Sequence, residues 1–173
     1  MIYKLGALKP ELGENNYVAD NATVIGNVHF GNNVSVWFSA VVRADMSSIT
    51  VGDDSNIQDN VTVHGDTPYP VKIGKRVTIG HNCIIHGCTI EDECVIGMGS
   101  TILNGSVIPK NCLVAAGSVV TPKLKANEGD LIAGIPAKVV RPLTEENRKY
   151  LKYAYKTYIE DIKNYSQNLV KID

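Results

Sequence analysis

Three of the four histidines lie close together in the sequence, as His64 in DNVTVHGD and as His81 and His86 in IGHNCIIHG. Neutral imidazole nitrogens are common ligands of zinc and other divalent transition metals, at a distance of about 2.0–2.1 Å for zinc. A single outward histidine is usually only solvated, and this is how we interpret His29. Whether the other three form a metal site depends on the elements that carry them.

Much of the chain follows a repeat with a period of six residues. Neither an α-helix nor an alternating strand has this period, whereas a short strand followed by a tight corner does. A small residue or a valine stands two positions before almost every repeat residue. The repeat residues are Val18, Val24, Phe30, Val36, Val42, Val51, Ile57, Val63, Ile73, Ile79, Ile85, Ile90, Ile96, Ile102, Ile108, Val114 and Val120.

Three such units close a triangular coil of about 18 residues, and successive coils stack about 4.8 Å apart through parallel ladders. We therefore expect an all-β chain in which residues 1–142 form a parallel β-helix. Residues 143–173 are expected to form a helix on its side, within the same domain, with Thr144 as N-cap. Its apolar stripe comprises Leu151, Ala154, Tyr155, Tyr158, Ile162, Tyr165 and Leu169.

Three units per coil place Val42, Val63 and Ile85 in one column, so the residues that follow them also stack. These are Arg43, His64 and His86, at one outward edge. The repeat is interrupted after each of the three column residues. We expect loops at these interruptions, where functional residues often lie.

His81 belongs to the preceding face, beside Gln58, with a corner of the prism between it and the other two histidines. One chain therefore cannot easily close a three-histidine site. A neighbouring chain can, and the sequence predicts a homotrimer with a metal site between subunits.

Other reactive side chains have simpler interpretations. Cys83, Cys88, Cys94 and Cys112 could be ligands or disulfides, but each occupies the small-residue position and none forms a CxxC pair. We interpret them as free, buried thiols. The segment Arg43–Ala44–Asp45 could be no more than an ion pair between subunits.

The segments VWFSAVVRAD, VGDDSNIQDNVTVHG and VTIGHNCIIHG resemble the γ-class carbonic anhydrases of the hexapeptide-repeat superfamily. The resemblance covers nearly the whole chain, including GIPAKVVR, and implies a left-handed β-helix. It also implies that His64, His81 and His86 bind Zn²⁺ or Fe²⁺, two of them from one subunit and one from the next.

The resemblance implies roles for other residues as well. Arg43 and Asp45 match an inter-subunit network near the metal, and Gln58 matches the glutamine that hydrogen-bonds solvent there. Asn56 and Tyr158 match other positions around the pocket.

The implied activity is the reversible hydration of carbon dioxide to bicarbonate, since three neutral imidazoles leave a divalent ion an open position and lower the pKa of a bound water toward about 7. Met46 stands where the best-characterised member has a glutamate, and the segment between His64 and His81 lacks that member's long acidic loop. We therefore expect slow proton transfer and a low activity.

Three alternatives stay open: a hexapeptide acyltransferase with a lone catalytic histidine, an acyl-CoA thioesterase, and a weakly active metal-binding scaffold trimer. The formal net charge of -1 gives no reason to expect nucleic acid or an anionic membrane as a partner. No apolar run is long enough to span a bilayer, and the first residues lack a signal-peptide pattern, so we expect a cytoplasmic protein.

Overall fold

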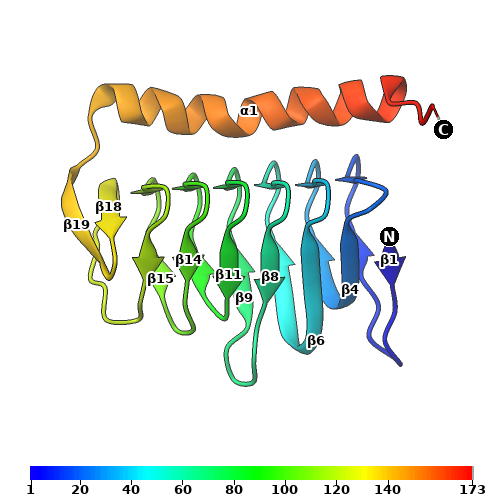
Figure 1. Cartoon of the computed structure of the whole chain (residues 1–173), viewed down its shortest axis with the longest axis horizontal. Coiled ribbons are helices and arrows are strands. Elements are labelled where there is room, and N and C mark those ends of the chain that lie inside the picture. The colour runs from blue at the N-terminus through cyan, green and yellow to red at the C-terminus, as the bar shows by residue number, and fades with distance from the viewer. Residues whose placement is uncertain (173) are drawn as a thin grey trace.

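The computed structural model describes residues 1–172, which form a parallel β-helix with one α-helix along its side (Figure 1). The strands are short because each one ends at a corner of the coil. They are β1 (Ile2–Tyr3), β2 (Glu11–Leu12), β3 (Tyr17–Val18), β4 (Thr23–Phe30), β5 (Ser35–Val36), β6 (Val41–Val51), β7 (Asn56–Ile57), β8 (Thr62–His64), β9 (Val71–Ile73), β10 (Thr78–Ile79), β11 (Ile84–His86), β12 (Thr89–Ile90), β13 (Val95–Ile96), β14 (Thr101–Ile102), β15 (Val107–Ile108), β16 (Leu113–Val114), β17 (Val119–Val120), β18 (Asp130–Gly134) and β19 (Ala137–Pro142).

The coils have three faces. The first is the sheet in the order β19-β18-β16-β13-β10-β7-β5-β3. The second carries β8, β11, β14 and β17, and the third carries β9, β12 and β15. The long strand β6 joins these two faces into one sheet, because Val41–Arg43 pairs with β8 and Ile49–Val51 pairs with β9.

The register confirms the six-residue repeat. Val18 pairs with Val36 and Ile96 with Val114, each one coil apart. Large aliphatics point into the prism, and Ile57, Ile79 and Ile96 form a fully buried column. Burying each such side chain contributes about 1.5–3 kcal/mol.

The corners need residues that tolerate a left-handed backbone. Asn60 and Asn82 have φ of 59° and 61°, and Gly99 and Gly117, at the same corner of later coils, both have φ of 70°. Asparagine and glycine adopt this conformation more readily than most residues. Repeated use of these residue types therefore keeps the corners aligned.

Strands also precede the first repeat residue, Val18, because β1 and β2 pair with β4. The expected loops are absent at two of the three interruptions. After Val42, β6 continues through the corner as an extended strand, and after Ile85 only residues 87 and 88 separate β11 from β12. The expected loop after Val63 does exist as residues 65–70, which protrude between β8 and β9 (Figure 1).

Helix α1 (Glu145–Asn168) runs back along the first face, toward the N-terminal coils (Figure 1). Thr144 is its N-cap in a capping box with Asn147. Leu151, Ala154 and Ile162 are buried, as the stripe predicted, but Leu169 follows the helix as its C-cap and is 51% exposed. Within residues 1–172, no helix has both the length and the apolar character needed to cross a membrane.

The four cysteines are free and buried, as predicted. Burial raises the pKa of Cys83 to about 11 and that of Cys88 to about 12. The Cys94 thiol donates to Pro109 O at 3.0 Å. Ser55 occupies the equivalent corner of an earlier coil, and its hydroxyl donates to Gly74 O at 2.9 Å. Cysteine and serine thus make the same kind of bond there.

We predict that Cys94→Ser lowers the free energy of unfolding by less than about 1 kcal/mol, because the hydroxyl retains the corner hydrogen bond. Cys94→Ala should cost about 1–2 kcal/mol, because it also leaves a small cavity. Urea denaturation monitored by circular dichroism measures both. A larger loss for serine than for alanine would contradict the assigned role of the corner residue.

Candidate metal centre

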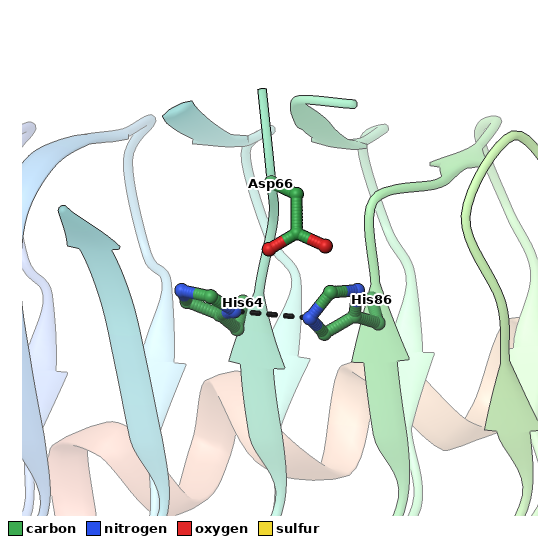
Figure 2. Close-up of side chains that lie close together, drawn as sticks. All are labelled: His64, Asp66 and His86. Atoms are coloured by element: carbon green, nitrogen blue, oxygen red, sulfur yellow. Dashed lines mark hydrogen bonds between the residues drawn. The ribbon is translucent and has the colours of Figure 1, made fainter. Parts of the chain in front are cut away.

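His64 and His86 are stacked neighbours at the ends of β8 and β11. The register pairs His64 with His86 and Arg43 with His64, which confirms the predicted column. His64 Nδ1 lies 3.0 Å from His86 Nε2 (Figure 2). His64 is buried and His86 is partly buried.

The outer nitrogen of each imidazole has its own partner. His64 Nε2 donates to Asp45 Oδ1 at 3.0 Å. His86 Nδ1 donates to Asn104 Oδ1. Asn104 Nδ2 donates to Asp66 Oδ2 at 3.3 Å, and this second bond fixes the orientation of the Asn104 amide. With the protons on these outer nitrogens, the two facing nitrogens each carry a lone pair.

This arrangement fits a divalent metal ion. Two lone pairs 3.0 Å apart repel each other unless a positive charge lies between them. Two nitrogens bound to one tetrahedral ion at 2.0–2.1 Å lie roughly 3.3 Å apart. The pair can therefore bind an ion after a small movement.

Asp45 is suited to hold His64 in the required tautomer. Partial burial raises the pKa of the Asp45 carboxyl, but hydrogen bonds from His64 and Arg43 outweigh it and leave that pKa below its ordinary value. The carboxylate therefore stays charged at neutral pH. Arg43 and Asp45 pair within one chain, so their contact does not require a second subunit.

His81 lies in a different group of side chains. Its Nδ1 is 2.9 Å from Asp59 Oδ2, and its backbone N–H donates to Gln58 Oε1 at 3.1 Å. Gln58 Nε2 in turn donates to Asn56 Oδ1 at 3.2 Å. When the Nδ1–H of the neutral His81 ring donates to Asp59, its Nε2 keeps a free lone pair.

A groove of about 490 Å³ between α1 and the first face is lined by His81, Gln58 and Tyr158. Burial raises the pKa of Tyr158 to about 12, so its phenol is neutral, and its ring packs edge-on against Trp37. Val95 and Leu113 are among the apolar residues that line the groove.

The site residues predicted from the sequence thus form two groups on different faces of one chain. Arg43, Asp45, His64 and His86 make one group, at the second face. The other comprises Asn56, Gln58, His81 and Tyr158.

Asp66 and Asn104 were not predicted from the sequence. Ligand atoms of His64, Asp66 and His86 all lie within 4.8 Å of one another. Asp66 lies in the interruption that follows His64, and Asn104 stands 18 residues after His86, one coil further on. The same counting of coils could have pointed to Asn104.

Comparison with known proteins supports the family assignment. A carbonic anhydrase of Geobacillus kaustophilus is 36% identical over 160 residues, which cover 92% of this chain and 88% of that protein. The mitochondrial gamma carbonic anhydrase 2 of Arabidopsis thaliana is 42% identical over 156 residues. The chain belongs to the γ-carbonic anhydrase family.

Two further findings bear on this membership. A family model described as the hexapeptide repeat of succinyl-transferase matches residues 70–104. A crystal structure of a Bacillus cereus protein described as an acetyltransferase is 37% identical with a TM-score of 0.93, and covers 97% of this chain and 98% of that one. The match to the Arabidopsis relative covers 87% of this chain but only 56% of the relative. The chain therefore spans little more than half of the relative's length.

We predict that Asp45→Asn weakens metal binding about 10- to 100-fold, because the carboxylate that holds His64 in its ligating tautomer is lost. Competition with a chromophoric chelator measures the affinity. Asp53→Asn is the matched control, since Asp53 also pairs with a cation, Lys75, but elsewhere on the coil. Equal affinities of the Asp45→Asn variant and the unmodified protein would contradict the role given to Asp45.

Proposed function

We propose that this γ-carbonic anhydrase homologue hydrates carbon dioxide reversibly to bicarbonate at a metal centre shared by two subunits of a homotrimer. The observation that carries the proposal is the close approach of two imidazole nitrogens, His64 Nδ1 and His86 Nε2, at 3.0 Å. The identity of 36% to the Geobacillus carbonic anhydrase over 92% of the chain supports the choice of reaction.

The trimer is proposed because the potential ligands are divided between faces. His81 bonds to Asp59, away from the pair formed by His64 and His86. Each chain therefore offers both halves of a site. A closed threefold arrangement uses every half once, with His81 of one subunit against the pair of the next, and gives three sites.

Zinc is the proposed ion, with Fe²⁺ as the other candidate, because imidazole nitrogens suit both. When bound by three neutral imidazoles, such an ion supplies a Lewis acid with an open position and a water whose pKa is lowered toward about 7. Asp45 and Asp59 hold His64 and His81 with their ligating nitrogens free of protons.

Gln58 is proposed to orient the reacting water. Asn56 accepts one hydrogen of the Gln58 amide nitrogen, so the second remains available as a donor. Asn56 itself is held by its bond to Thr78 Oγ1 at 2.9 Å, which fixes the position of Gln58. The apolar side chains of the adjoining groove, Val95 and Leu113, suit a nonpolar substrate such as carbon dioxide.

Proton release is proposed to limit the rate. Met46 is 57% exposed and follows Asp45, and its side chain has no group that can accept a proton at neutral pH. We therefore propose a hydration activity that is real but modest, and that rises with the concentration of added buffer.

The Bacillus cereus relative gives a reason to test a second activity. Its description as an acetyltransferase raises acyl transfer or acyl-CoA hydrolysis as the competing reaction. Hydrolysis of acetyl-CoA and transfer to an amine should be assayed on the same sample as hydration. Acyl-CoA activity without hydration would replace the proposal, and inactivity in both assays would favour a scaffold.

We predict that the metal-loaded protein hydrates carbon dioxide in a stopped-flow indicator assay, and that His64→Ala, His81→Ala and His86→Ala each lower kcat/KM by about 100-fold or more. His29→Ala is the control, since His29 bonds to Glu11 and Asn27, away from the cluster. Full activity of the His81→Ala variant would contradict the shared site.

A further inference from the structure

A third potential ligand, Asp66, lies beside the two imidazoles within the same chain. Figure 2 shows its carboxylate beyond the ends of the two strands that carry His64 and His86, directed toward the gap between the rings. Within the described residues 1–172, the cluster consists of His64, Asp66 and His86 and does not include His81. One chain by itself therefore presents two histidines and one carboxylate.

The loop of residues 65–70 is built to hold Asp66 in this place. Thr67 Oγ1 donates to Met46 O at 2.8 Å, and Ser47 Oγ donates to Tyr69 O at 3.4 Å, which fastens the loop to β6. A Cβ atom at Gly65 would lie 2.5 Å from Tyr69 O and 2.6 Å from Ser47 Oγ. The chain therefore leaves β8 in a turn that has no room for a larger residue.

Asn104 connects the carboxylate to the histidine pair. Its amide nitrogen donates to Asp66 Oδ2, and its amide oxygen accepts from His86 Nδ1. The same side chain thus orients both Asp66 and His86. Asp66 Oδ2 keeps a second lone pair and Asp66 Oδ1 keeps both of its own for another partner.

We propose that a single chain captures a divalent metal ion through His64, His86 and Asp66, before a second chain contributes His81. Two imidazoles and one carboxylate are a recognised ligand set for Zn²⁺ and for Fe²⁺, and they leave positions open for a further nitrogen ligand. The anionic carboxylate also offsets part of the ion's charge. This inference rests on the proposed metal centre. It adds a state in which one chain holds the ion before His81 of a second chain binds it.

A purely structural role for Asp66 is the competing explanation, because the residue also orients Asn104. Asp66→Asn separates the two, since an asparagine oxygen can still accept from Asn104 Nδ2 but is a neutral and weaker ligand. A structural role would leave metal affinity unchanged in this variant.

The test uses full-length protein carrying His81→Ala, in which the ligand from the neighbouring chain is absent. Co²⁺ is the probe, and both its affinity and its visible absorption spectrum are measured. His81→Ala should bind one Co²⁺ per chain. Adding Asp66→Asn should weaken binding at least about 10-fold and change the absorption spectrum, whereas adding Glu160→Gln on the exposed face of α1 should do neither.

Two results overturn the inference: no Co²⁺ binding by His81→Ala, or equal affinities with and without Asp66→Asn. The proposed function is judged separately, by hydration activity of the unmodified protein. Active unmodified protein together with no effect of Asp66→Asn defeats the single-chain site alone. A clear effect of Asp66→Asn together with inactive unmodified protein supports the single-chain site and defeats the proposed reaction.

Discussion

Two imidazole nitrogens, His64 Nδ1 and His86 Nε2, face each other across 3.0 Å, on strands β8 and β11 of one parallel ladder. The ladder fixes the two backbones, while Asp45 and Asn104 fix which nitrogen of each ring carries the proton. The repulsion between the lone pairs is relieved when a cation lies between them. The proposed metal chemistry, and the account of the surrounding carboxylates, depend on this constraint.

The triangular cross-section explains why one chain holds only part of the proposed site. Residues three units apart stack on one face, so β8 and β11 bring His64 and His86 together. His81 follows β10 on the first face, where Asp59 and Gln58 hold it. No change of side-chain rotamer carries His81 around a corner of the coil, and this is why the proposed three-histidine site takes His81 from a second chain. The early capture of metal by Asp66 would let the half-site load before that chain arrives.

The sequence predicted most of the fold and the stacking of the histidines, because every coil obeys the same count and burial specifies the register. The column of Val42, Val63 and Ile85 was correct for this reason. Prediction failed where the chain departs from three six-residue units per coil. Strand β1 lies at the open end of the stack with both residues exposed, so it has no buried pattern to reveal it. Asp66 is placed by side-chain and backbone bonds of an irregular loop, which no periodicity encodes.

The most direct test of the shared centre mixes two inactive chains, His64→Ala and His81→Ala, carrying different affinity tags, and isolates mixed trimers by tandem purification. Around a closed ring of three, any mixed trimer contains one interface that joins an intact His81 to an intact pair of His64 and His86. If the centre is shared between subunits, mixed trimers recover about one third of the unmodified hydration activity, while each parent stays inactive. Mixed trimers with no recovered activity would show that the three histidines do not act across the interface between subunits.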